Sequence, residues 1–243
     1  MNRRTRLQTQ PRPRQPWTLE NLLSEARLGP YLEATDGSLT SALRLYHWNA
    51  QISSAFHEVL HYAEVGLRTA MDRQLTAWAI ELGAQPSWYC DPLVPLTPQT
   101  RRKVEEARGN ATRGGQPELH GKVVAELMLG FWWSLLSDEY NRRLWQPCLR
   151  HAFDGPVRRA RLHSELDDLR RLRNRIAHHE PVHGRNLTAD RRRVLDVAER
   201  ISPRLCERID AVSRVPGLLL ERPEGRFDQR LTPSVRVLAG PGR

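Results

Sequence analysis

The sequence predicts an all-α fold, a bundle of long helices. Apolar residues recur at spacings of three and four through most of the chain, which places them on one face of successive helices. No segment before residue 215 alternates apolar and polar residues as a half-buried strand does, and there is no internal repeat. With 243 residues, 39% of them hydrophobic, the chain is long enough to bury a sizeable core.

The two ends of the chain differ in composition from the middle. The first sixteen residues mix Pro, Arg and Gln without helical periodicity, so we expect a disordered basic arm at residues 1–16. Residues 17–214 form the expected helical domain, and scattered Pro, Gly and Arg at 215–243 predict a loosely attached tail. Thr18 is a suitable N-cap for a short first helix with the apolar residues Leu19, Leu22, Leu23 and Ala26.

The clearest helical pattern begins near Leu39, after a turn at Asp36-Gly37. Its i, i+3, i+4 spacing produces one apolar stripe, which consists of Ile52, Phe56, Val59, Leu60, Ala63, Leu67, Ala70 and Met71. This long helix is expected to form the centre of the bundle.

Proline and glycine mark the boundaries of the later elements. Residues 83–98 read as a connection, and Thr97-Pro98 predicts a cap and a first-turn proline for a helix that ends at about Arg108. Further helical patterns cover residues 119–136, 138–152, 156–177 and 189–212. Pro147 interrupts the second of these, Pro181 ends the third and Pro203 bends the fourth.

Composition limits the classes of partner. The net charge of +10 and a pI near 10.4 suit a polyanion such as RNA or DNA, because neutralising phosphates releases counterions. A general preference for arginine explains part of this charge, since Lys103 and Lys122 are the only lysines. No run of eighteen apolar residues and no signal peptide is recognisable, so we expect a cytoplasmic protein without a membrane partner. Three widely spaced cysteines predict neither a disulfide framework nor a thiolate zinc site.

One motif points to zinc chemistry. The segment HEVLH, residues 57–61, is the H-E-x-x-H pattern that on a helix binds zinc through two histidines and uses the glutamate as a base. Catalytic zinc takes three protein ligands. A third histidine six residues later is missing, because Glu64 and Leu67 occupy the places of the glycine and histidine of that pattern. The other zinc pattern takes a glutamate from a later helix as its third ligand. Glu81 lies at a suitable separation, but its neighbours are not those that orient such a ligand. A zinc hydrolase therefore remains a remote alternative, and we predict no metal.

The same helix carries a row of polar residues beside its apolar stripe. At about 100° per residue, His57, His61, Glu64 and Arg68 lie within one narrow arc. This row either lines a cleft or forms a solvated flank with an ordinary Glu64–Arg68 ion pair. We predict that it faces the cleft that contains the second motif.

The second motif is RNRIAHHEP, residues 173–181. Arg173 shares a helical face with Leu166, Leu169 and Ile176, where a cation is costly unless it has a partner or a function. His178 lies five positions later, about 140° around a continuous helix. Because Pro181 disfavours helical angles at the residue before it, we expect the helix to fray here and let a histidine turn back toward Arg173.

An arginine and a histidine that converge on one phosphate supply what metal-free RNA cleavage requires. Histidine titrates near neutrality and can move the proton of the 2′-hydroxyl or of the leaving group. Arginine offers a planar fork to the phosphorane oxygens. The alternative interpretation is an ordinary helix C-terminus, where Arg175, His178 and His179 interact favourably with the helix dipole.

The segment LRNRIAHHEPV, residues 172–182, resembles the signature of the HEPN superfamily, whose R-x(4–6)-H motif has a polar residue after the arginine. Asn174 occupies that place. The chain is similar to the Abi-like (abortive infection) branch over roughly residues 20–210, in the order SEARLGPYL, ALRLYHWNAQISSAFHEVL, EVGLR and KVVAELMLGFWWSLL followed by LW.

The resemblance implies a HEPN-type helical bundle with extra N-terminal helices that forms a homodimer and acts as a metal-independent endoribonuclease without a cofactor. By position, Arg173 and His178 are the catalytic pair and Asn174 supports them. Supporting roles also fall to His179, Glu180, Glu64 and Arg68, although Thr69 stands where relatives commonly have asparagine. The nearby arginines expected to guide RNA are Arg170, Arg171, Arg175 and Arg185.

Such proteins act in phage defence or as toxins, with an antitoxin or a neighbouring regulatory protein as a further partner. The alternative to an enzyme is a binding protein, a module that binds RNA or another protein without cleaving it.

Overall fold

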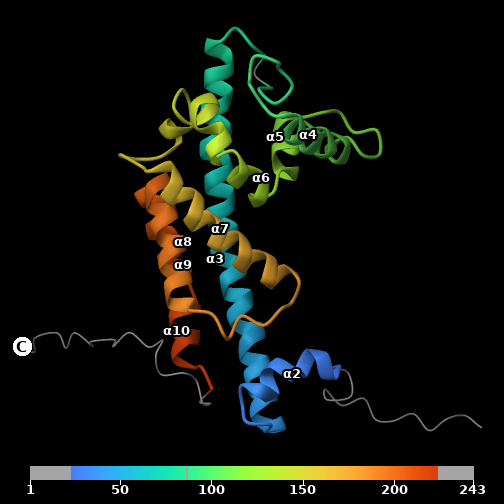
Figure 1. Ribbon diagram of the computed structural model, residues 1–243, viewed down its shortest axis with the longest axis vertical. Helices are drawn as coiled ribbons and strands as arrows, with labels where there is room; N and C mark the ends of the chain where they lie inside the picture. Colours follow the sequence, from blue (N-terminus) through green and yellow to red (C-terminus); the bar gives the residue numbers. More distant parts are fainter. Residues whose placement is uncertain (1–22, 86, 224–243) are drawn as a thin grey trace, which may run out of the picture.

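We describe residues 23–85 and 87–223 of a computed structural model. All regular structure in these residues is helical, which confirms the all-α prediction. One helix, α3 (Leu39–Glu81), runs the length of the molecule, and the other elements pack along it (Figure 1). The basic arm at residues 1–16 lies outside the described residues.

Helix α3 contains 43 residues and is therefore about 65 Å long. Ser38 caps it, because the Ser38 hydroxyl accepts a hydrogen bond from the Ser41 amide. The predicted apolar stripe is buried from Ile52 to Met71 except at Ala70, which is half-buried. A single helix thus provides one wall of the core for most of its neighbours.

The first described helix is α2 (Glu25–Glu33), with Leu28 and Tyr31 buried against the core. Its N-cap is Ser24, whose side chain accepts from the Arg27 amide. The short helix predicted to begin at Thr18 is a different segment, and Thr18, Leu19 and Leu22 lie outside the described residues.

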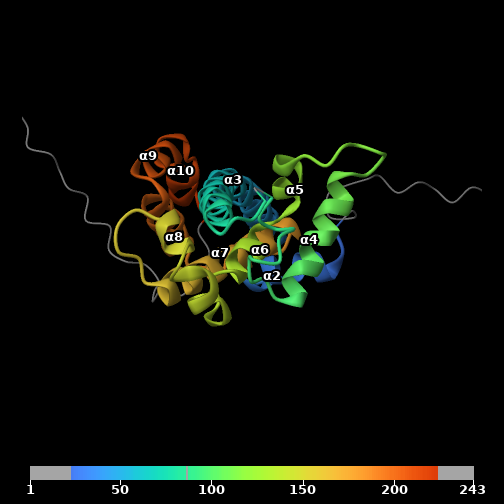
Figure 2. The ribbon, with the colours of Figure 1, turned by 90° about the horizontal axis from the view of Figure 1, so that it is seen from above.

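On one side of α3 lie α4 (Pro98–Ala111) and α5 (His120–Glu126), followed by α6 (Leu129–Ser134) (Figure 2). Thr97 and Pro98 begin α4 as predicted, and α4 continues three residues beyond Arg108. The single helix predicted at 119–136 is wrong, because the backbone becomes extended at Leu127. At this break the Leu127 carbonyl accepts a hydrogen bond from the Trp132 indole of α6.

The helical pattern at 138–152 forms only short turns. A 3₁₀ helix at Asp138–Tyr140 runs into a π-helical turn at Asn141–Trp145, and a second 3₁₀ helix follows at Leu149–Ala152. Pro147 has no amide proton and so cannot continue a helical hydrogen-bond ladder between them. The next helix, α7 (Arg159–Ala177), is regular throughout and crosses α3.

The helix predicted at 189–212 with a bend at Pro203 is two helices, α8 (Leu187–Ile201) and α9 (Pro203–Val212). Ser202 is fully extended between them, so the chain reverses and α8 and α9 lie side by side (Figure 1). Proline at the first position of α9 lacks the amide that would continue α8.

A short helix, α10 (Val215–Leu220), corrects the prediction of a loose tail from residue 215. Val215 is fully buried, and the Trp48 indole of α3 donates to the Leu218 carbonyl at 2.6 Å. The apolar residues at 215 and 218–220 make one helical turn that the surrounding Pro and Gly obscured in the sequence. The described domain therefore extends to Pro223, and residues 224–243 of the predicted tail lie outside the description.

Candidate active site

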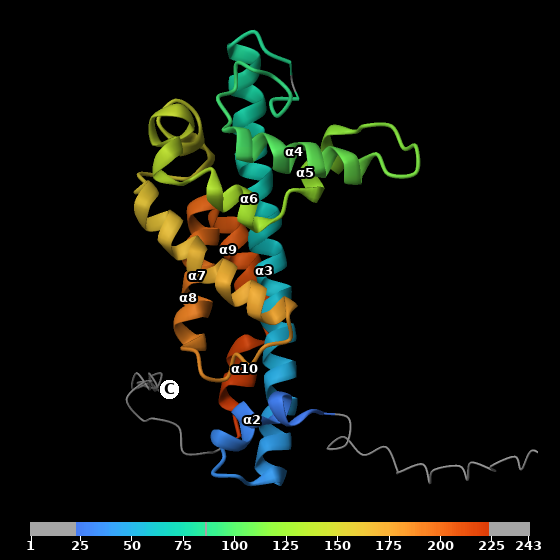
Figure 3. The same ribbon diagram turned by 45° about the vertical axis from the view of Figure 1, so that its right-hand side comes forward.

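Arg173 belongs to the C-terminal half of α7, and α7 crosses α3 (Figure 3). Its side chain is 23% exposed, and its Nε lies 3.9 Å from Glu64 Oε2. That distance is too long for a hydrogen bond, so the pair interacts through charge alone. The prediction that Arg173 shares the apolar face holds, because Leu166, Leu169 and Ile176 are buried.

Arg173 differs from comparable arginines in its hydrogen bonding. Within the described residues its guanidinium donates no hydrogen bond, and its N–H groups remain available to a ligand. Every other described arginine of intermediate exposure donates at least one; these are Arg27, Arg68, Arg101, Arg108, Arg159, Arg170, Arg175, Arg185, Arg191, Arg193, Arg200 and Arg222. A half-buried cation without hydrogen-bond partners suits an anion that approaches from solvent.

Glu64 and Arg68 bind the backbone of α5 and α6 and do not pair with each other. Glu64 Oε1 accepts a hydrogen bond from the Leu129 amide at 2.8 Å, at the first residue of α6. Arg68 Nη1 donates to the Ala125 carbonyl in the last turn of α5 at 3.1 Å. Glu64 therefore connects the start of α6 to Arg173, whereas Arg68 has a structural role.

The end of α7 does not fray as predicted. The His178 amide still donates to the Asn174 carbonyl at 3.0 Å, so the helical ladder is intact up to His178. His178 is the C-cap, and its side chain is exposed. Because the ladder is intact, Arg173 and His178 stay about 140° apart around the helix. The expected turn of the histidine toward Arg173 within one chain is thus wrong, and the only described partner of the Arg173 side chain is Glu64.

The chain turns one residue later, at His179, which has a φ of 55°. The His179 amide donates to the Ile176 carbonyl and the Glu180 amide to the Arg175 carbonyl, a pattern that closes helices and usually has glycine at this position. Arg27 of α2 donates to the His179 carbonyl, which helps to hold a conformation that is rare for histidine.

Contacts from α7 and α3 fix the loop that follows the motif. Arg175 donates to the Pro181 carbonyl through Nε and Nη2, at 3.1 and 2.8 Å. Buried Asn49 of α3 accepts hydrogen bonds from the amides of Val182 and His183 through Oδ1, at 2.8 and 3.1 Å. The exposed His178 therefore lies directly before a loop that hydrogen bonds hold in place.

The remaining predicted site residues are Asn174, Glu180 and His179, and they differ in exposure and in contacts. Asn174 is half-buried, and its side chain makes no hydrogen bond with any described residue. Glu180 is exposed and lies 3.6 Å from Arg175. His179 contributes its backbone conformation to the turn.

The four arginines expected to guide RNA all have partners inside the chain. Arg170 binds Asp167 and lies 4.5 Å over the Trp133 ring, while Arg171 pairs with the same carboxylate at 2.7 Å. Arg175 binds Pro181 as described, and Arg185 binds the buried Asp190 through two hydrogen bonds. Arg171 has the most exposed side chain of the four, at 65%.

The H-E-x-x-H segment lacks the geometry of a zinc site. His57 and His61 are exposed, and Glu58 accepts a hydrogen bond from Arg214 at 3.2 Å. Across residues 23–85 and 87–223, no three His, Cys, Asp or Glu side chains are grouped to hold a metal ion. The predicted polar row is divided: Glu64 faces Arg173 as expected, whereas His57 and His61 face solvent.

His183 and Asn49 are site residues that sequence reasoning missed. His183 is 8% exposed, and its ring packs against the Tyr31 ring in a tilted arrangement with the ring centres 4.9 Å apart. Its Nε2 has no hydrogen-bond partner among the described residues. The sequence contained one sign of the role of Asn49: it is a polar residue among apolar core positions, between Trp48 and Ile52. Together the two residues attach the motif-bearing loop to α3 and α2.

The titration of His183 predicts acid sensitivity. Burial, followed by the charges of Arg222 and Arg175, lowers the pKa of His183 below its ordinary value of 6.5. The unfolded chain therefore binds this proton more readily, and the free energy of unfolding falls as the pH drops below about 6.5, by at most about 1.4 kcal/mol per pH unit for one histidine. Urea unfolding at pH 8, 7, 6 and 5 should show a shallower decline for His183→Gln than for wild type. Parallel declines would contradict this assignment.

Comparison of the chain with known protein families, characterised proteins and solved structures finds no match. The described structure is an all-α domain built around one long helix, with a half-buried arginine beside a carboxylate and an exposed histidine at a helix end. None of the helices in the described part of the chain is long and apolar enough to cross a membrane.

Proposed function

We propose that the protein is a metal-independent endoribonuclease of the HEPN type. The observation that carries the proposal is Arg173, the half-buried arginine whose guanidinium donates no hydrogen bond to any described residue. It belongs to an R-x4-H motif in which His178 is exposed and Asn174 has an unused side-chain amide.

In the proposed reaction an RNA 2′-hydroxyl attacks the adjacent phosphorus, and the bond from phosphorus to the 5′-oxygen breaks. The products are a 2′,3′-cyclic phosphate and a 5′-hydroxyl, so the atoms balance without water or a metal ion. His178 transfers the proton of the attacking or leaving oxygen, and Arg173 stabilises the phosphorane charge. Asn174 orients the substrate or the histidine.

The proposal requires a second copy of the chain. Arg173 and His178 point in different directions around one α7, so one phosphate meets both side chains only if a second α7 contributes. We therefore propose a homodimer in which two motifs form one composite site. In the cell the enzyme would act in the cytoplasm in phage defence or as a toxin, restrained by an antitoxin or a neighbouring regulatory protein.

A second candidate is a module that binds RNA or protein without cleaving it. The lack of contact between Arg173 and His178 favours it, as does the internal pairing of the arginines expected to guide RNA. The experiment below separates the two candidates.

Purified full-length protein is expected to cleave RNA in EDTA, and His178→Ala should lower the rate by a factor of about 10² to 10⁴, the usual contribution of a general acid or base. His57→Ala is the matched control, because His57 is also an exposed histidine and lies outside the motif. Circular dichroism and size-exclusion chromatography confirm that both variants fold and associate like wild type. Equal cleavage by wild type and His178→Ala would refute the proposal, and RNA binding without cleavage would establish the second candidate.

A further inference from the structure

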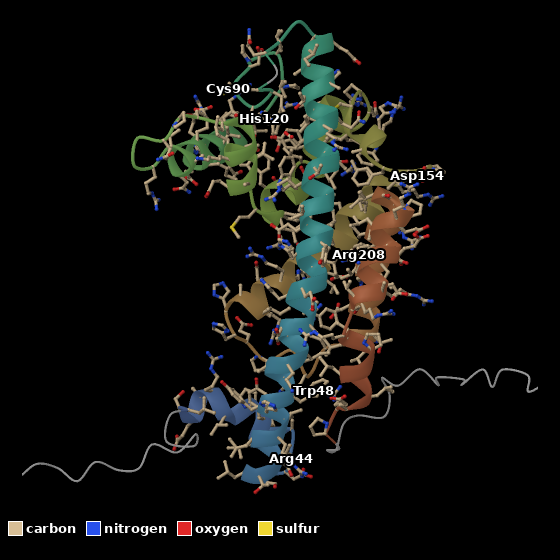
Figure 4. The ribbon with its side chains drawn as sticks, turned by 180° about the vertical axis from the view of Figure 1, so that it is seen from behind. Arg44, Trp48, Cys90, His120, Asp154 and Arg208 are labelled. Carbon is tan, nitrogen blue, oxygen red and sulfur yellow. The ribbon has the colours of Figure 1, made fainter. Side chains whose placement is uncertain are left out.

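A groove of about 540 Å³ lies between the first turns of α3 and the segment that follows α10. Its volume is within the range of about 300 to 1,000 Å³ typical of small-molecule sites. Apolar surface comes from both sides, with Leu43 on α3 and Pro223 opposite, while Trp48, which is only 2% exposed, lies beneath them. Figure 4 shows Arg44 and Trp48 one above the other at the end of α3 that lies beside α10.

Hydrogen bonds hold the walls of the groove in place. The Trp48 indole donates to the Leu218 carbonyl, and Arg222 donates to the His183 carbonyl at 2.7 Å. The Arg222 guanidinium lies 5.2 Å from the centre of the Trp48 ring, which attaches the segment after α10 to α3. The groove therefore exists before any ligand binds, which limits the ordering cost of binding.

The rim of the groove carries polar groups without partners among the described residues. Arg44, His47 and Gln51 are exposed, lie on one side of α3 and make no hydrogen bond or ion pair with any described residue. Arg44 and His47 are one turn apart, so an anion can contact both. The Glu221 carboxylate lies on the other rim and is an acceptor for hydroxyl or amino groups.

We propose that this groove binds a free nucleoside monophosphate. The base lies between the side chains of Leu43 and Pro223, and the phosphate lies against Arg44 and His47. Gln51 and Glu221 hydrogen-bond the edge of the base or the ribose.

This site is separate from the candidate active site. Arg44 and Glu64 are twenty residues apart on the same helix, a distance of about 30 Å. The inference therefore does not depend on ribonuclease activity, and a failure of that activity would leave it standing.

Calorimetric titration of the full-length protein with AMP, GMP, CMP and UMP tests the proposal. At least one should bind in a 1:1 ratio, at least tenfold more tightly than inorganic phosphate and than the corresponding nucleoside. Arg44→Gln should weaken binding about tenfold, which corresponds to about 1.4 kcal/mol. Arg73→Gln, which removes an exposed and unpaired arginine near the other end of α3, is the control and should bind like wild type.

Several outcomes would overturn the proposal. Phosphate or nucleoside binding as tightly as the nucleotide would rule out a site that needs both groups. Equal weakening by Arg44→Gln and Arg73→Gln would show that only net charge matters. Binding of a short oligoribonucleotide without binding of any free nucleotide would assign the groove to RNA instead.

Discussion

Arg173→Ala is expected to lower the rate of RNA cleavage in EDTA about 100- to 1000-fold, or about 3–4 kcal/mol of transition-state stabilisation, and to leave the helical content unchanged. The effect is large because the Arg173 N–H groups have no hydrogen-bond partner among the described residues, so a phosphorane oxygen is the partner that the proposal gives them. Folding should tolerate the change, because Arg173 contributes only a 3.9 Å ion pair to the chain.

Arg173→Lys separates charge from geometry. Lysine keeps the positive charge, but it lacks the planar fork that binds two phosphate oxygens, so it should recover only a small part of the rate. Arg192→Ala is the control, because Arg192 is exposed on α8 and has no described partner. Single-turnover rates distinguish the outcomes. Wild-type rates for Arg173→Ala, or equal losses for Arg173→Ala and Arg192→Ala, would remove Arg173 from the proposed chemistry.

The sequence predicted the elements that depend on local periodicity. The apolar stripe of α3 is buried because every three- or four-residue step returns to the same side of a helix. The same rule placed Arg173 beside Leu169 and Ile176 on the inner face of α7. Such positions need no knowledge of distant residues.

The break between α5 and α6 could not be read from the sequence in the same way. Residues 119–136 keep a helical apolar pattern, but a carboxylate 65 positions away, Glu64, accepts a hydrogen bond from the Leu129 amide. A local pattern contains no information about that partner. The helix α10 shows the converse case, since its single short apolar turn is supported by the burial of Val215 and by the hydrogen bond from Trp48 to the Leu218 carbonyl.

The residues of the candidate site were chosen from the motif, but the local geometry around them could not be read from it. Pro181 correctly indicated that α7 ends nearby, but the turn is made at His179 and held by Arg27 and Asn49 from other helices. Because these contacts span more than 130 positions in the chain, the direction of His178 could not follow from the motif alone.

Asn49→Leu is expected to destabilise the protein by about 2–6 kcal/mol, the sum of about 1–3 kcal/mol for each of two buried backbone amides that lose their acceptor. Asn49 Oδ1 is the hydrogen-bond partner of the Val182 and His183 amides, and leucine has a similar volume but no acceptor. The loop that carries His178 should move with these amides, so RNA cleavage should fall as well. Urea unfolding at pH 7.5 measures the change in free energy.

The control for this substitution is Gln51→Leu, which makes the same kind of change two residues along the same helix. Gln51 is exposed and makes no hydrogen bond with a described residue, so its replacement should change the free energy of unfolding by less than about 0.5 kcal/mol. A loss confined to Asn49→Leu would show that the loop after the motif depends on α3 for its position. Equal small effects for both variants would mean that the amides of Val182 and His183 find water instead, and the fixed placement of His178 would then have to be abandoned.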